Sequence, residues 1–175
     1  MKFIPALALT PLILLVAAST PAAGGIITYN IAFSGSQSVP PNGSAGTGTA
    51  SVTVNDILNT VSVSLTYSGL TAGATAAHIH CCVAITSAGP VVIPFTGFPN
   101  TVAGTYSNTF TGISAANIAG IENGLAYINI HNPVFPGGEI RANIVTPEPA
   151  SLGLMGLGLL ALLGARARRN RRFAS

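Results

Sequence analysis

The chain is poor in charged residues. Its 175 residues include seven lysines and arginines and four aspartates and glutamates, so 6% are charged, whereas soluble domains average roughly 25%. A nucleic-acid-binding protein needs a basic face and a coiled coil needs charged flanks, so both classes are excluded. Tryptophan is absent, and the two cysteines allow one disulfide at most.

The sequence also lacks the common motifs of catalytic sites. It contains no G-x-S-x-G, H-E-x-x-H, G-x-G-x-x-G or P-loop pattern. Glu122 and Glu139 are the only carboxylates of the central region that could act as a pair in acid–base catalysis. We therefore expect a protein that is not an enzyme.

The few basic residues are concentrated at the two ends. Lys2 begins the chain, and five arginines fall within its last ten positions. The long stretch between them holds one basic residue, Arg141, against four acidic ones. This central part is weakly acidic, so no nucleic-acid partner is expected for it.

The first 23 residues have the layout of a secretory signal peptide. Lys2 precedes an apolar run from Phe3 to Ala18, and small residues with a proline follow from Ser19 to Gly25. The apolar run is short for a membrane span, which needs about 20 residues, so cleavage is favoured over an uncleaved anchor. We expect residues 1–23 to be removed on export.

A second apolar segment lies near the C-terminus. Residues 150–165 are rich in glycine and leucine, and they stand between Pro147-Glu148-Pro149 and the arginine cluster. As a helix, this hydrophobic segment would extend about 24 Å, which is enough to cross a thin bilayer. Arginines beyond such a helix favour the cytoplasmic side, so the body of the protein is expected on the outer side.

The order of these three parts resembles the PEP-CTERM sorting signal of Gram-negative bacteria, over residues 146–172. The resemblance implies recognition of Pro147, Glu148 and Pro149 by an exosortase and transient anchoring in the inner membrane. It further implies delivery to the cell surface or the extracellular matrix. Proteins with this signal often accompany exopolysaccharide production.

Between residues 25 and 145, polar and apolar residues alternate as they do in half-buried strands. The clearest examples, 50–54 and 61–67, are joined by a connection short enough for a hairpin. Further strands are expected at 26–33, 76–85, 91–95, 104–111, 125–131 and 139–145. Seven or eight short antiparallel strands predict one all-β domain, a Greek-key sandwich or barrel, and residues 114–123 predict one short helix.

Several blocks of this domain resemble the CHRD (chordin-type) family. In the family's order, they are Ser34–Pro41, Gly46–Val54, Ala76–His80, Ala126–His131 and Pro136–Arg141. Animal chordins are secreted antagonists of bone morphogenetic proteins, whereas bacterial members have no established biochemical activity. The resemblance therefore implies a fold and an extracellular location, and Cys81-Cys82 replaces a Gly-rich loop of many members.

All three histidines of the chain lie in these blocks. His78 and His80 are two apart on a strand, so both side chains point to one face, and His131 ends another strand. An H-x-H pair with a distant third histidine can supply three nitrogen ligands to copper or zinc. The favoured alternative is structural, with the histidines bonded to neighbouring backbone groups and to Glu139.

The same layout resembles copper/zinc superoxide dismutase, a Greek-key barrel that binds copper through an H-x-H strand and one late histidine. The remaining ligands of that enzyme have no counterpart here, because the chain has only three histidines. Dismutase activity is therefore not expected.

Two cysteines and a polar pair complete the candidate residues. An exported chain meets an oxidising compartment, so Cys81 and Cys82 are expected to form a vicinal disulfide, with metal ligation or intermolecular links as alternatives. Glu139 and Arg141 share one face of a strand. For Arg141, an ion pair with Glu139 or Glu122 is favoured over anion recognition.

The sequence thus predicts an exported, exosortase-sorted protein of the cell surface or extracellular matrix. Its role would be adhesive or scaffolding, without a cofactor, and its partners would include exopolysaccharide or matrix proteins besides the transient exosortase. The alternative is a protein that holds one copper or zinc ion through His78, His80 and His131.

Overall fold

The computed structural model describes residues 24–145 and residue 158 of the chain. The predicted signal peptide, the Pro147-Glu148-Pro149 motif and the predicted hydrophobic helix lie outside these residues. No helix of the described part is long and apolar enough to span a membrane.

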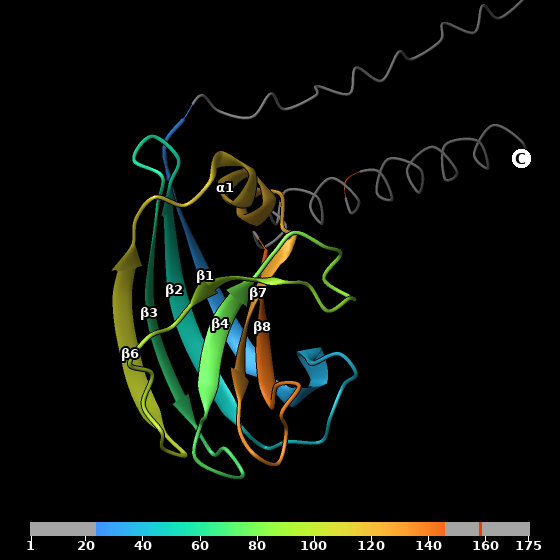
Figure 1. Ribbon diagram of the computed structural model, residues 1–175. Helices are drawn as coiled ribbons and strands as arrows, with labels where there is room; N and C mark the ends of the chain where they lie inside the picture. Colours follow the sequence, from blue (N-terminus) through green and yellow to red (C-terminus); the bar gives the residue numbers. More distant parts are fainter. Residues whose placement is uncertain (1–23, 146–157, 159–175) are drawn as a thin grey trace, which may run out of the picture.

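The described chain folds into eight antiparallel strands with one α-helix and one short 3-10 helix, Gly35–Gln37 (Figure 1). The strands are β1 (Ile26–Ser34), β2 (Thr47–Asn55), β3 (Thr60–Ser68), β4 (Ala76–His80), β5 (Val91–Pro94), β6 (Gly104–Phe110), β7 (Ala126–His131) and β8 (Ile140–Ile144), and the helix is α1 (Ala115–Glu122). The predicted all-β fold is confirmed. β4 is shorter than the predicted 76–85 because it ends at His80, just before the two cysteines.

The strands form one sheet in the order β5-β4-β7-β8-β1-β2-β3-β6. Neighbours such as β3 and β6, or β4 and β7, are not consecutive in the chain, so the connections cross between the two halves as in a Greek key. The sheet curls into a nearly closed barrel, with β4, β7 and β8 in front of β1, β2 and β3 (Figure 1).

An aromatic cluster packs at the seam between the two edge strands. Phe95 follows β5 and stacks on Tyr106 and Phe110 of β6, with ring centroids 5.0 and 5.6 Å apart. Phe98 stacks on Tyr67 at 5.3 Å. Because such pairs exclude water from exposed strand edges, this cluster joins the two ends of the sheet without a continuous backbone ladder.

Side chains that point inward from alternate positions of the strands fill the barrel. Every second residue of β2 and β3 is buried, including Val52, Val54, Val61 and Val63, which are at most 1% exposed. Helix α1 covers one end of the barrel, where Ile118 and Ile121 join the core (Figure 1). Its N-cap is the predicted one, since the Ser114 hydroxyl accepts a hydrogen bond from the backbone N–H of Asn117 at 3.3 Å.

Candidate metal site

The pairing of β4 with β7 brings the three histidines together. In this register His78 lies opposite Asn129, and His131 lies opposite Ala76, one diagonal step from His78. Because Ala76 is small, the imidazole of His131 has room beside that of His78. The ring centroids of His78 and His131 are 5.1 Å apart, and those of His78 and His80 are 5.6 Å apart.

Each of the three histidines offers one ring nitrogen as a potential metal ligand. These three atoms all lie within 4.8 Å of one another, and no other cluster of this kind occurs within residues 24–145. In a tetrahedral site with metal–nitrogen bonds of about 2.0 to 2.1 Å, two nitrogens are about 3.3 Å apart. An ion would therefore draw the rings inward by about an ångström, which side-chain rotation allows.

Backbone carbonyls fix the orientation of two of the rings. The Nδ1 atom of His80 lies 2.7 Å from the carbonyl oxygen of Gly89, and that of His131 lies 2.9 Å from the carbonyl oxygen of Pro136. A carbonyl can only accept, so each Nδ1 carries the proton and each neutral ring keeps its lone pair on Nε2. The same arrangement orients histidines that bind metals.

The nitrogens left over have no hydrogen-bond partner among the described residues. They are Nδ1 of His78 and Nε2 of His80 and His131, and all three are buried. A buried polar atom without a partner costs about 1 to 3 kcal/mol, so three of them in one cluster call for an explanation. The Oδ1 atom of Asn129, which stands opposite His78, is a fourth such atom on this face.

A stack of side chains supports His80 from behind. Its ring lies parallel to that of Tyr127, with centroids 4.7 Å apart, and the guanidinium carbon of Arg141 lies 3.4 Å from the Tyr127 centroid. The gap between the two rings is too thin for a guanidinium, so Arg141 covers the other face of Tyr127. The Tyr127 hydroxyl accepts a hydrogen bond from the backbone N–H of Gly89, the residue whose carbonyl holds His80.

Arg141 also fixes the loop that carries Gly89. Its guanidinium donates to the carbonyl oxygens of Ile85 and Ser87 and, through Nε, to Asn143. Arg141 is 2% exposed, so these charge-assisted hydrogen bonds form away from water. Arg141 therefore positions His80 indirectly, through the loop and through Tyr127.

Comparison with protein families identifies the fold. The model of the CHRD domain matches residues 29–144, which is well over half of the chain. The chain belongs to the CHRD family. The histidine cluster lies within this CHRD domain, on strands β4 and β7. No curated protein and no solved structure is significantly similar to the chain.

The segment after the CHRD domain matches a second family model, the PEP-CTERM protein-sorting motif, over residues 145–169. The resemblances to the CHRD family and to the PEP-CTERM signal are thereby confirmed. The motif marks the protein for export, for processing by an exosortase, and for sorting to the cell surface or extracellular space.

The structure gives Glu139 and Arg141 of the CHRD domain separate partners. Glu139 is fully buried and accepts hydrogen bonds from the Ser44 hydroxyl, from the backbone N–H of Thr71 and from the Asn132 amide. The ion pair expected from the sequence, between Arg141 and Glu139 or Glu122, is therefore not observed among the described residues, since Arg141 on β8 donates to the loop between β4 and β5 and to Asn143. Glu139 instead ties three loops together at one end of the barrel.

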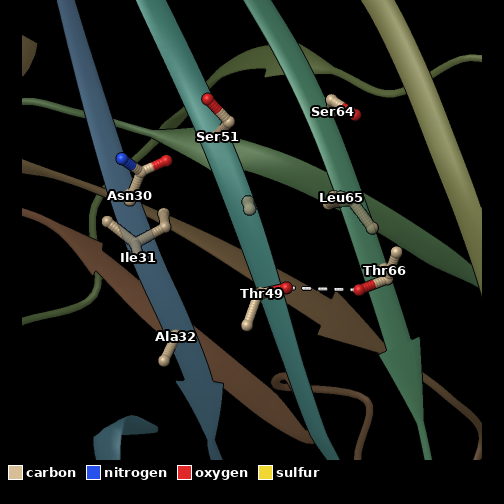
Figure 2. A pocket seen from close by; sticks show the side chains of 9 residues that line it. Asn30, Ile31, Ala32, Thr49, Ser51, Ser64, Leu65 and Thr66 are labelled. Carbon is tan, nitrogen blue, oxygen red and sulfur yellow. Dashed lines mark hydrogen bonds between the residues drawn. The ribbon is translucent and has the colours of Figure 1, made fainter.

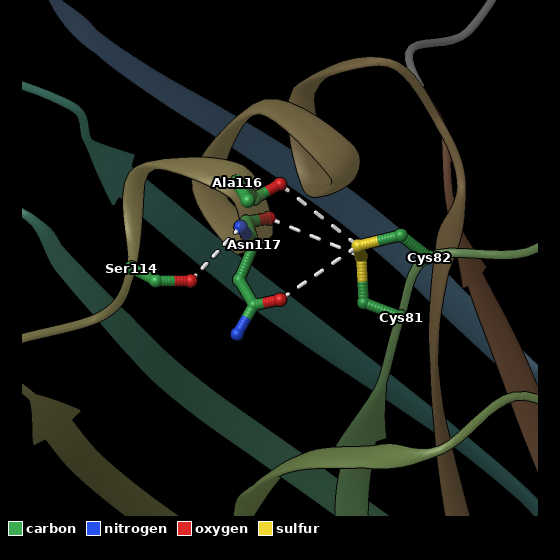
Figure 3. The surroundings of a disulfide bond; sticks show 5 residues. All are labelled: Cys81, Cys82, Ser114, Ala116 and Asn117. Atoms are coloured by element: carbon green, nitrogen blue, oxygen red, sulfur yellow. Dashed lines mark hydrogen bonds between the residues drawn. A yellow bond between two sulfur atoms is a disulfide. The ribbon is translucent and has the colours of Figure 1, made fainter.

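Cys81 and Cys82 form a vicinal disulfide directly after His80 (Figure 3). The Cys81 sulfur lies 3.9 Å from the Asn117 carbonyl oxygen, and the Cys82 sulfur lies 3.8 Å from Asn117 Oδ1. Because disulfide sulfurs carry no proton, these are packing contacts between the disulfide and helix α1. With both sulfurs facing α1, the histidine cluster consists of nitrogen donors.

The disulfide leaves no space for a side chain at Gly120 of α1, because a Cβ atom there would collide with both sulfurs. We expect Gly120→Ala to lower the unfolding free energy by about 1 to 3 kcal/mol through overpacking. Gly43→Ala is the matched control, since nothing lies within 4 Å of a Cβ at Gly43. Urea denaturation measures both, and equal stability of the two variants would contradict the packing described.

Acid should destabilise the metal-free CHRD domain. Burial, with smaller contributions from neighbouring imidazoles, lowers the pKa of His78 below its ordinary value of 6.5. Burial lowers the pKa of His131 as well, against an opposing hydrogen bond to Pro136. Between the unfolded and folded pKa values the unfolded chain binds more protons, so stability is complete above about pH 7 and falls as the pH drops through 6.5 and below.

Denaturation in urea with a chelator, at pH 7.5 and at pH 5.5, measures this effect. The wild type should unfold at lower urea at pH 5.5, and His78→Gln with His131→Gln should weaken the dependence on pH. An unchanged midpoint between the two pH values would contradict the lowered pKa of His78 and His131.

Sequence reasoning found the three histidines and their shared face but not their surroundings. The carbonyls of Gly89 and Pro136 belong to loops and carry no sequence signal as acceptors. The stack of Tyr127 on His80 depends on the pairing of β7 with β4, which the sequence does not specify. The role of Asn129 follows from the register, which the sequence does not specify.

Proposed function

We propose that this CHRD protein is a non-enzymatic metal-binding component of the cell surface or extracellular matrix. In this proposal His78, His80 and His131 hold one copper or zinc ion. The PEP-CTERM motif supports the extracellular location, and an adhesive or scaffolding role in the matrix is compatible with a bound ion that is structural or stored.

One observation carries the proposal: His78, His80 and His131 offer three ring nitrogens within 4.8 Å of one another, and each of these rings has a buried nitrogen without a hydrogen-bond partner. A purely structural role for the histidines would leave each of these atoms unsatisfied in the folded state. The low pKa of His78 and His131 supports the proposal further, because neutral imidazoles are the form that binds metals.

The chemistry of the donors favours copper and zinc over other ions. Imidazole nitrogen suits both metals, whereas calcium and magnesium require oxygen ligands. For a given set of nitrogen donors copper(II) binds more tightly than zinc(II). Three protein nitrogens leave a coordination position for water, or for Asn129, whose Oδ1 lies on the same face.

Calorimetric titration of the secreted protein with copper(II) and with zinc(II) tests the proposal. We expect one equivalent of either ion to bind, copper(II) more tightly than zinc(II), with dissociation constants well below about 100 µM. Asn108→Ala, on strand β6, is a control variant that should bind both ions as the wild type does. Heats no larger than those of dilution for both ions would refute the proposal.

A further inference from the structure

The outer face of strands β1, β2, β3 and β6 carries a regular array of hydroxyl groups. In the observed register, Thr28, Thr53, Ser62 and Thr109 stand side by side in one row across the four strands. Across this row and the next two, every outward-facing residue is serine or threonine, with the exceptions of one asparagine on β1 and one alanine on β1. We call this surface the hydroxyl face.

Neighbouring hydroxyls of this face are bonded to each other. Thr28 pairs with Thr53 at 2.9 Å, and Ser62 pairs with Thr109 at 2.9 Å. Thr49 pairs with Thr66 at 3.2 Å (Figure 2). These pairs hold the side chains in fixed positions. Neighbouring residues within a row are about 4.8 Å apart, and successive rows are about 6.8 Å apart along the strands.

Folding alone does not account for this composition. An exposed face of an antiparallel sheet needs polar residues, and lysine and glutamate ordinarily supply many of them. The hydroxyl face has no charged residue in its three rows. It also lacks the exposed aromatic and arginine side chains that dominate protein–protein interfaces.

The face is hollowed along β2 and β3. One shallow depression, of about 470 Å³, is lined by Asn30, Ser51 and Ser64, and a second, of about 360 Å³, extends toward Ser68. Figure 2 shows the first depression, and both include the pair Thr49 and Thr66, so the two adjoin and form one groove along the strands.

We propose that this groove binds an uncharged polysaccharide lying along strands β2 and β3. Each serine or threonine hydroxyl both donates and accepts, which matches the hydroxyl groups of a sugar polymer. With no cation on the face, carboxylate or sulfate groups of an anionic polymer would find no partner. The occupant is therefore a neutral glycan.

The affinity for a single sugar should be low, because a hydroxyl hydrogen bond replaces one to water and contributes only about 1 kcal/mol. A long polymer offers the same contacts repeatedly, so binding is expected from its multivalency. Display at the cell surface supplies many copies of the face to one polymer chain.

Affinity electrophoresis of the secreted protein in gels containing soluble neutral glucan (hydroxyethyl cellulose) or anionic alginate tests this proposal. We expect the neutral glucan to retard the protein and alginate not to. Replacing Thr49 and Thr66 together by valine should reduce the retardation at least fivefold. Thr111→Val removes an exposed hydroxyl outside the strands and should leave it unchanged.

A second double variant and a chelator control complete the experiment. Ser51→Ala with Ser64→Ala removes two more hydroxyls of the groove, should reduce retardation in the same way, and guards against misfolding of the valine variant. A chelator should not alter retardation, which separates this inference from the proposed metal site. Retardation unaffected by both sets of variants, or stronger with alginate, would overturn it.

Discussion

Replacing His80 by alanine will lower the affinity for copper(II) by at least about 100-fold. Loss of a residue that merely orients a metal ligand typically costs 10- to 100-fold, and this change removes one of the three proposed ligands itself. His80 is also the most constrained of the three, since Gly89 holds its Nδ1 and Tyr127 stacks on its ring. Competition with a chromogenic chelator measures the affinity.

His131→Ala provides an independent variant, because its ring is held by a different loop, at Pro136. It should cause a loss of similar size, while Asn108→Ala should cause none. If His80→Ala and His131→Ala both bind copper(II) as tightly as the wild type, the metal must bind elsewhere and the assigned site is wrong.

Arg141→Met should weaken metal binding less, by about 10- to 100-fold. It would free the carbonyls of Ile85 and Ser87 and loosen the loop whose Gly89 orients His80. Arg141→Lys keeps the charge but not the planar fork, so it should restore affinity only in part. Unaltered copper affinity in a folded Arg141→Met protein would show that the loop does not position the site.

Replacing Glu139 by alanine will lower the unfolding free energy by about 3 to 5 kcal/mol. Its carboxylate is fully buried and holds Ser44, Thr71 and Asn132, so its loss removes the acceptor of two part-buried donors and leaves the buried amide of Asn132 without this charged acceptor. Each such donor costs about 1 to 3 kcal/mol, and loss of a buried network belongs among the severe single changes.

Chemical denaturation of Glu139→Ala and of Glu139→Gln measures this effect. The glutamine keeps one acceptor oxygen and the shape of the side chain, so its loss should be clearly smaller. Glu122→Ala changes a carboxylate that makes no such network and is the matched control. Equal midpoints for Glu139→Ala and Glu122→Ala would contradict the role assigned to Glu139.

Local patterns predicted most of the fold. Alternation of polar and apolar residues located all eight strands, and Ser114 marked the start of the one helix. The end of β4 was missed because residues 81–85 remain apolar in composition although the chain turns at the cysteines. Strand order and register depend on long-range packing, so the sequence indicated a Greek key without specifying the neighbours.

The three histidines of the candidate site could be predicted from the sequence, whereas the contacts of the residues around them could not. His78 and His80 are two residues apart on a strand, so they were expected on one face. His131 lies in another segment that resembles the CHRD family, and the pairing of β4 with β7 brings it beside them. The partners of Glu139 were not predictable, because Ser44, Thr71 and Asn132 come from three loops whose approach depends on the closed barrel. The expected pair with Arg141 failed for the same reason, since each side chain found nearer partners in a different loop.

The hydroxyl face could not be predicted from the sequence alone. Serine and threonine alternating with apolar residues were visible in each strand, yet only the register aligns them into rows across four strands. A shift by one residue in any pair would bury the hydroxyls and expose the core. The hydroxyl face is therefore a property of the fold.

The metal content of the protein isolated from the surface of its own cells tests the central claim most directly. Elemental mass spectrometry should find one copper or zinc ion per chain, and X-ray absorption should show imidazole nitrogens at about 2.0 to 2.1 Å from it. The same preparation of a variant without the three histidines should contain no bound ion. Native protein without copper or zinc, even from cells grown with both metals, would contradict the account.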